Sequence, residues 1–153
     1  MQSITLIPRS QIKRFEVTCL YFPPDANVDI VLVHGLSGDP EKTWTAKNGV
    51  FWPTDLLPAS LKGAKARILV YGYNADVYAF GGDRSASSDM IHQHAQTLVT
   101  GLSLERQSED CGENAIIWVA HSLGGILIKR VSASTNSFGP FDSPNLTNPS
   151  LGS

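Results

Sequence analysis

Short apolar runs alternate with helical patterns along this chain of 153 residues. Each run is rich in β-branched and aromatic residues and predicts a strand. The last three runs lack polar alternation, which is typical of strands buried on both faces. The four predicted strands span residues 15–22, 29–35, 66–73 and 114–120. Strands that alternate with helices favour an α/β fold, with a mostly parallel sheet covered by helices on both faces.

A long helix is predicted over residues 88–107, between the third and fourth strands. Its apolar positions recur at helical spacing and would face the sheet: Ile91, Ala95, Leu98, Val99 and Leu102. The neighbouring SASSD segment offers N-cap side chains. The segment WPTDLLPASLKG predicts a shorter helix that breaks at Pro58, and LGGILIKR begins another helix.

Composition changes at about Val131. Residues 131–153 are rich in Ser, Asn, Pro and Gly and show no apolar period, which is typical of a disordered or foreign extension. We therefore expect residues 1–130 to be the N-terminal part of one α/β domain, and residues 131–153 to be a tail outside it.

The charge and composition narrow the classes of partner. A formal net charge of -2 and a pI near 6.0 do not favour a nucleic-acid partner. No stretch reaches the roughly 18 apolar residues of a membrane span, and the N-terminus lacks a secretory signal pattern. Cys19 and Cys111, without C-x-x-C spacing, fit a reduced intracellular protein. No cluster of ligand residues implies a metal or cofactor.

The segment AHSLG directly follows the fourth predicted strand and begins a helix. A sharp strand-to-helix turn can expose one serine hydroxyl, provided that the flanking residues are small. Ala120 and Gly124 flank Ser122 in this way, close to the pattern G-x-S-x-G, and Gly125 eases the packing of helix on sheet. The Leu123 N–H, at the helix N-terminus, would face a developing oxyanion. His121 lies within this predicted elbow.

A second turn supports this interpretation. The strand over residues 29–35 ends in His34-Gly35-Leu36. In nucleophile-elbow hydrolases a loop after an earlier strand supplies the second oxyanion N–H, and Leu36 is our candidate. A glycine-rich turn with no catalytic role would have the same sequence pattern, both here and at Ser122.

These residues resemble the α/β-hydrolase fold, and more narrowly a family of serine esterases. That family includes the serine-active-site-containing protein and, more distantly, the GPI inositol deacylases. The matching segments, VLVHGLSGDPEKTWT, FWPTDLLP, ARILVYGYNAD and AIIWVAHSLGGILIKR, cover about residues 29–130. The resemblance implies a lipase-like hydrolase that acts on acyl esters or lipids through Ser122. Some relatives are associated with mitochondria or the endoplasmic reticulum, and in others this domain heads a larger signalling protein.

The chain departs from the family pattern after Ser122. The triad runs Ser, then Asp or Glu, then His, whereas only Asp142 and no histidine follow Ser122. His92 and His94 lie two apart and face different sides of the predicted helix, and their spacing is not that of a helical zinc pair. We therefore expect the N-terminal portion of a longer hydrolase, inactive or nearly so alone. Its fourth strand would be an open edge that invites a strand-pairing partner.

Three alternatives stay open beside this expectation. The domain is a non-catalytic interaction module, or the head of a larger signalling protein, or an enzyme completed by another chain. A nucleotide-binding domain is disfavoured, because neither G-x-G-x-x-G nor G-x-x-x-x-G-K-[ST] occurs. The sequence does not identify the acyl substrate.

Overall fold

The computed structural model describes residues 3–76 and 84–135, which form a mixed, mostly parallel sheet with helices on it. Its strand order is β1-β2-β4-β3-β5. The β3–β4 and β3–β5 pairs are parallel, whereas the β1–β2 and β2–β4 pairs are antiparallel. The strands are β1 (Thr5–Leu6), β2 (Val17–Phe22), β3 (Val28–Val33), β4 (Ala66–Tyr71) and β5 (Ala115–Ala120). The α/β prediction is confirmed, and β1 is an addition to the four predicted strands.

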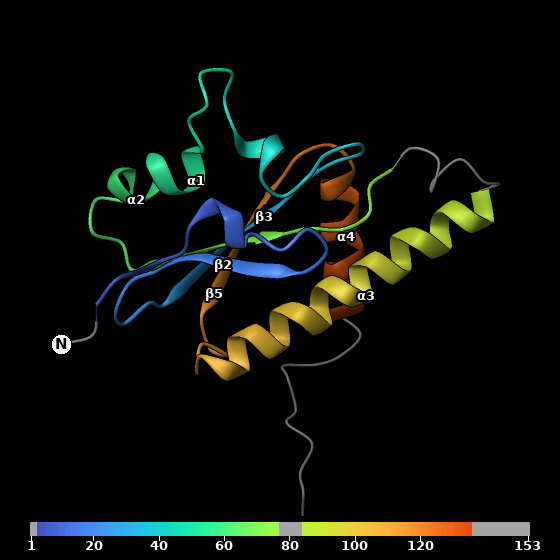
Figure 1. Ribbon diagram of the computed structural model, residues 1–153. Helices are drawn as coiled ribbons and strands as arrows, with labels where there is room; N and C mark the ends of the chain where they lie inside the picture. The colour runs from blue at the N-terminus through green and yellow to red at the C-terminus, as the bar shows by residue number, and fades with distance from the viewer. Residues whose placement is uncertain (1–2, 77–83, 136–153) are drawn as a thin grey trace, which may run out of the picture.

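Two longer helices, α3 (Arg84–Ser108) and α4 (Leu123–Thr135), cover one face of the sheet (Figure 1). The predicted apolar stripe of α3 packs there, with Ala95, Leu98 and Leu102 buried and Ile91 and Val99 partly buried. This confirms the predicted stripe, because apolar residues three and four apart share one side of a helix.

The opposite face is covered by shorter pieces: η2 (Lys42–Trp44), α1 (Trp52–Asp55) and α2 (Leu57–Ser60). The 3-10 turn η1 (Arg9–Gln11) lies before β2. Buried Trp44 and Phe51 pack on this face, and the Trp44 and Trp52 rings meet edge to face at 5.8 Å. The break between α1 and α2 falls at Leu56 rather than at the predicted Pro58, which sits in the first turn of α2, where a missing N–H costs nothing.

Two predicted boundaries differ from the structure. The SASSD segment, residues 85–89, lies inside α3 rather than before it, so its expected capping role is wrong. Helix α4 continues through Thr135, and the predicted domain boundary at residue 130 therefore falls within a helix. Residues 136–153, including Asp142, lie outside the described residues.

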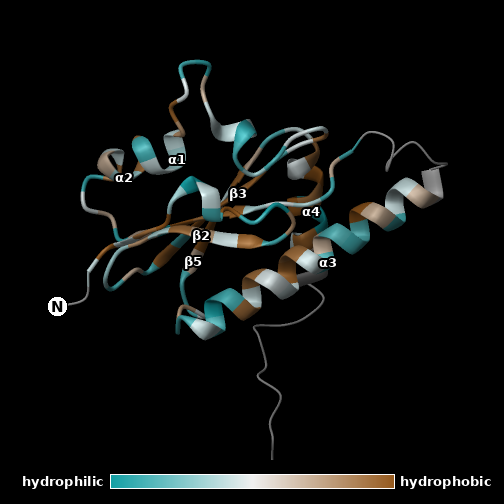
Figure 2. Cartoon of the chain, in the orientation of Figure 1, coloured by the Kyte–Doolittle hydropathy of each residue, from teal (hydrophilic) through white to brown (hydrophobic). Residues whose placement is uncertain are grey.

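Strand β5 is an edge of the described sheet, because it pairs with β3 alone. The expectation that it is buried on both faces is wrong: Ile116 and Ile117 are 37% and 51% exposed. The expectation of an open edge is confirmed for the described residues. Figure 2 shows that the apolar residues otherwise concentrate in the central strands and in the helices packed on them.

A buried ion pair ties together the amino ends of the parallel strands. Nε and Nη2 of Arg67 donate to both carboxylate oxygens of Asp29 at 2.8 and 2.9 Å, and neither side chain is exposed. Asn114 Nδ2 donates to Asp29 Oδ1 at 2.9 Å. Glu105 and Arg106 of α3 approach Arg67 and Asp29, each at 3.6 Å. The C-terminal end of α3 is therefore held to this end of the sheet.

Candidate active site

Ser122 lies at the turn between the end of β5 and the start of α4, with its side chain exposed. Its φ is +54°, in the left-handed region that costs an L-residue roughly 1–2 kcal/mol. The His121 N–H donates to the Val33 carbonyl at 3.1 Å, which joins the turn to the end of β3. The Gly124 N–H donates to the His121 carbonyl at 3.0 Å, and the Gly125 N–H to the Ser122 carbonyl at 3.0 Å. These bonds hold Ser122 in a strained conformation.

Small residues around Ser122 are required by close backbone contacts. A Cβ at Gly124 would lie 2.6 Å from the His34 carbonyl oxygen and closer still to that of Val33. A Cβ at Gly35 would lie 2.6 Å from Ser122 Cβ. At Gly125 a Cβ would lie 4.0 Å from Ala120 Cβ, which is an ordinary contact. The turn thus needs glycine at 35 and 124, whereas position 125 has room for a methyl group.

The predicted oxyanion loop is a tight turn beside Ser122. The Gly38 N–H donates to the Gly35 carbonyl at 3.0 Å, and Ser37 has a φ of +54°. A positive φ at the third residue only is the signature of a type II turn. The Ser37 N–H donates to the Ala75 carbonyl at 2.7 Å. The Leu36 N–H, between these two bonded groups, has no hydrogen-bond partner among the described residues.

The start of α4 contributes a second unbonded N–H. Leu123 is the first residue of the helix, so its N–H has no acceptor one turn earlier. None of the described residues accepts a hydrogen bond from it. Unpaired N–H groups of Leu36 and Leu123 therefore flank the turn that carries Ser122. Two such donors are what an oxyanion of acyl transfer requires.

His34 is fully buried, and both of its ring nitrogens are engaged. Nδ1 lies 3.0 Å from the Gly35 carbonyl and must donate to it, whereas Nε2 accepts from the Tyr73 N–H at 3.3 Å. These partners fix the neutral tautomer with its proton on Nδ1. Burial lowers the pKa of His34, although the Gly35 carbonyl partly opposes this. His34 therefore shapes the loop and offers Ser122 no base.

The other histidines do not complete a triad among the described residues. His121 is exposed, and no described side chain hydrogen-bonds to it. His94 lies half-buried with its ring 5.1 Å from that of Tyr73, and Nδ1 of His92 is buried without a hydrogen bond. Ser122 Oγ receives no hydrogen bond from any described residue. Among the described residues, the turn thus holds an exposed serine with a positive φ beside two unpaired N–H groups, and no histidine is aligned on its hydroxyl.

Tyr73 and Ala75 follow β4 and contact the predicted oxyanion loop, and nothing in the sequence marked them as part of the site. The segment ARILVYGY indicated a buried strand, and nothing in it showed which loop its end would contact. Periodicity reports burial but not the identity of the neighbour.

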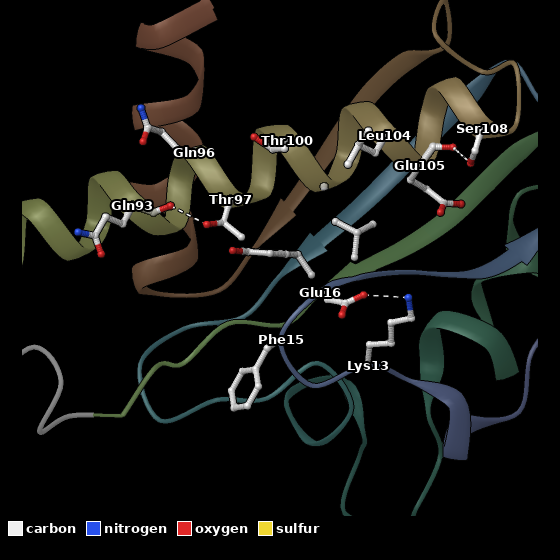
Figure 3. Close-up of a pocket in the computed structure, with 13 residues that line it drawn as sticks. Lys13, Phe15, Glu16, Gln93, Gln96, Thr97, Thr100, Leu104, Glu105 and Ser108 are labelled. Atoms are coloured by element: carbon white, nitrogen blue, oxygen red, sulfur yellow. Dashed lines mark hydrogen bonds and ion pairs between the residues drawn. The ribbon is translucent and has the colours of Figure 1, made fainter.

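A groove of about 930 Å³ lies elsewhere, between α3 and the loop that precedes β2 (Figure 3). Exposed Phe15 and Leu104 line it, together with polar side chains of α3 such as Gln93 and Thr97. Ser122, Leu36 and Leu123 are not among its lining residues, so this groove is separate from the turn that carries Ser122.

Three further observations bear on the chemistry. Both cysteines are free, and burial raises the pKa of Cys19 to about 12 and also raises that of Cys111, so neither is a reactive thiolate at neutral pH. Within residues 3–76 and 84–135, no group of three or more His, Cys, Asp or Glu side chains could hold a metal ion. Over the same residues, none of the helices has the length and apolar character needed to cross a bilayer.

Among known proteins, the chain is similar to Protein SERAC1 of Danio rerio, at 31% identity over 121 residues. The aligned region is 67% of this chain and 18% of that protein, so the chain spans less than a fifth of its curated relative. No family model matches the chain, and no solved structure matches it. This similarity supports a distant relationship to the family that the strand and turn segments resemble, and the α/β sheet is consistent with it.

Proposed function

We propose that this chain belongs to a serine ester hydrolase, with Ser122 as nucleophile and acyl esters or lipids as substrates. The observation that carries the proposal is the strained φ of +54° at Ser122, on a turn between strand and helix. Strain at a non-glycine residue persists only where the surrounding structure imposes it, and it concentrates at functional sites. The similarity to SERAC1 and the unpaired N–H groups of Leu36 and Leu123 support the same function.

In the proposed reaction Ser122 Oγ attacks the carbonyl carbon of the ester. The new C–O bond forms while the carbonyl π electrons move to oxygen, and the Leu36 and Leu123 N–H groups stabilise that oxyanion. Collapse of the intermediate breaks the bond to the leaving oxygen, which departs as the alcohol with the proton given up by the Ser122 hydroxyl. Water then hydrolyses the acyl-serine, which releases the carboxylic acid and restores the Ser122 hydroxyl. Each oxyanion donor contributes roughly 10²–10³ in rate.

The hydroxyl proton needs an acceptor, and no described side chain accepts it from Ser122. A site that retains only its oxyanion donors and binding reaches roughly 10³–10⁴ over the rate in water. We therefore expect slow acylation by this chain alone, and faster acylation when a base is supplied from outside.

Fluorophosphonate labelling followed by intact mass measurement tests the proposal. The adduct is expected to form slowly at Ser122, and added imidazole should accelerate it by taking the Oγ proton. Ser122→Ala should abolish the adduct, whereas Ser60→Ala, which removes another exposed serine, should not. A folded protein that gains no adduct at Ser122 even with imidazole would refute the proposed function.

A second candidate function, a strand-pairing module, is favoured by the open edge of β5. The N–H groups of Ala115 and His121 donate toward β3, so the alternate residues Ile116, Trp118 and Ala120 point their N–H and C=O groups away from the sheet. This edge carries neither a charge nor a proline. Its proposed occupant is an extended, uncharged apolar segment of a partner polypeptide.

A pair of proline variants tests this second candidate. Ile116→Pro removes an outward N–H and leaves the pairing with β3 intact, so it should abolish binding of an extended Val/Thr-rich peptide to a folded protein. Ile117→Pro removes an inward donor and should unfold the strand. Equal peptide binding by wild type and Ile116→Pro would refute the module, and dimers lost in Ile116→Pro would assign the edge to a second copy instead.

The resemblance also supports an intracellular place for the protein, at mitochondria or the endoplasmic reticulum. Fluorescence microscopy of the tagged chain tests this part of the proposal, and a secreted product would contradict it.

A further inference from the structure

Residues 73–75, which follow β4, form hydrogen bonds to the predicted oxyanion turn at residues 34–37. Tyr73 is 3% exposed, and its phenol donates to the His34 carbonyl at 2.8 Å. Its own N–H donates to Nε2 of His34 at 3.3 Å, and the two rings stack at 4.3 Å with only 5° between their planes. Two residues further on, the Ala75 carbonyl accepts the Ser37 N–H at 2.7 Å. Three hydrogen bonds thus join residues 73–75 to residues 34–37.

These bonds fix the orientation of particular peptide groups. Type I and type II turns differ in the orientation of their central peptide, so whatever holds that peptide selects the turn type. The bond from Ser37 to Ala75 holds the N–H of that central peptide toward β4. The bond from Tyr73 holds the His34 carbonyl, and the ring of His34 holds the Gly35 carbonyl. The Leu36 N–H belongs to the same peptide group as the Gly35 carbonyl, which accepts from His34 Nδ1 and from the Gly38 N–H. Its direction is therefore fixed, although no described residue accepts a hydrogen bond from it.

From this geometry we propose that Tyr73 is a positioning residue for the oxyanion hole: through His34 it sets the direction of the Leu36 N–H beside Ser122. The inference rests on the proposed function, because it assigns a task to a group of that site. Burial raises the pKa of Tyr73, so its phenol stays protonated and remains a donor. A misplacement of about 1 Å in a catalytic group can cost roughly 100-fold in rate, so loss of this bond should be measurable.

The strand supplies a matched control in Tyr71. Its phenol is also buried, also donates to a backbone carbonyl, that of His94 at 3.1 Å, and its ring stacks on Tyr73 at 5.6 Å. That carbonyl belongs to α3 and not to the oxyanion turn. Tyr71→Phe and Tyr73→Phe therefore remove equivalent bonds from one strand end, and only one of the two bonds reaches the turn.

The experiment measures imidazole-assisted fluorophosphonate labelling of Ser122 together with amide hydrogen exchange of Ser37. Tyr73→Phe should slow labelling roughly 10- to 100-fold and accelerate exchange at Ser37, because the turn loses one of its three restraints. Tyr71→Phe should lower the melting temperature by a similar amount and leave both readouts unchanged.

Three outcomes of this experiment decide the inference. If Tyr73→Phe matches Tyr71→Phe in labelling and in Ser37 exchange, Tyr73 has a structural role only. If Tyr73→Phe does not fold, His34→Gln, whose amide oxygen can accept the Tyr73 N–H, must still slow labelling less than His34→Leu does. If wild type is unlabelled, the proposed function fails, and the Ser37 exchange rates still decide whether Tyr73 fixes the turn.

Discussion

The two ends of the parallel strands differ in how they satisfy their polar groups. At the amino end, the Asp29 carboxylate receives Arg67 at 2.8 and 2.9 Å and Asn114 at 2.9 Å, all within the sheet or directly beside it. At the carboxyl end, Ser122 is strained and the N–H groups of Leu36 and Leu123 stay unpaired among the described residues. Strand β3 runs from one end to the other, so a single element supports both.

The contrast separates stability from function. A buried charge is tolerated only with its partners, and the amino end provides them in full for Asp29. The carboxyl end keeps a strained residue and unpaired N–H groups, neither of which stabilises the fold. Such features are typical of sites that bind a ligand or a transition state. Four changes test this separation, in order of decreasing effect.

The largest effect is expected at the amino end. Asp29→Asn removes the carboxylate that both Nε and Nη2 of Arg67 contact and leaves the buried guanidinium only the looser approach of Glu105 at 3.6 Å. The free energy of unfolding should therefore fall by about 3–5 kcal/mol. Urea denaturation measures this loss. Asp25→Asn, which breaks the exposed pair with Lys65 at 3.4 Å, is the control and should change little. If Asp29→Asn lowers the free energy of unfolding no more than Asp25→Asn does, the buried pair at the amino end does not stabilise the fold as we infer.

The next effect concerns the contact between α4 and β3. Gly124→Ala places a methyl group 2.6 Å from the His34 carbonyl oxygen, and we expect a loss of roughly 1–3 kcal/mol together with slower labelling of Ser122. Gly125→Ala meets no such contact and lies inside a helix, where alanine should add up to about 1 kcal/mol. Thermal unfolding of the two variants gives both values. Opposite signs are expected, and equal destabilisation would contradict the close approach.

A smaller effect should report the backbone strain at Ser122 itself. Ser122→Gly should be more stable than Ser122→Ala by about 0.5–1 kcal/mol, because glycine accepts a φ of +54° that alanine resists, less the entropy that glycine loses. The two variants lack the hydroxyl alike, so the difference reflects backbone conformation only. Chemical denaturation measures it. A more stable alanine variant would mean that Ser122 is not held in the left-handed region in solution.

The smallest effect is a pH dependence of the carboxyl end. Burial lowers the pKa of His34 and of His94 below the ordinary value of 6.5, with Asp39 partly opposing this at His34. Below about pH 6.5 the unfolded chain therefore binds protons that the folded chain does not, and the free energy of unfolding falls; above that pH the stabilisation is fully present. Melting temperatures from pH 5 to 8 measure this, and His34→Gln should flatten the slope. An unchanged slope in His34→Gln would exclude His34 as its source.

The sequence by itself determined the order of strands and helices and the position of the elbow. Apolar runs and helical spacing depend on local pattern, and the letters AHSLG place a small–Ser–Gly turn after a strand wherever the strand lies. It also indicated that the last predicted strand would be an open edge. The oxyanion candidate Leu36 came from the same local pattern, and it remains a prediction, as does the role of Ser122.

The tertiary structure alone decided which groups those letters meet. It brought Asp29 beside Arg67, 38 positions along the chain, and Tyr73 beside His34, 39 positions along. It also left Ile117 exposed, although the apolar run around this residue is typical of a buried strand. The periodicity of apolar residues predicts which side chains are buried. Which residues surround a buried side chain depends on the pairing of β3 with β4 on one side and with β5 on the other. The partners of a buried charge or ring nitrogen therefore follow from register and strand order, which no local pattern contains.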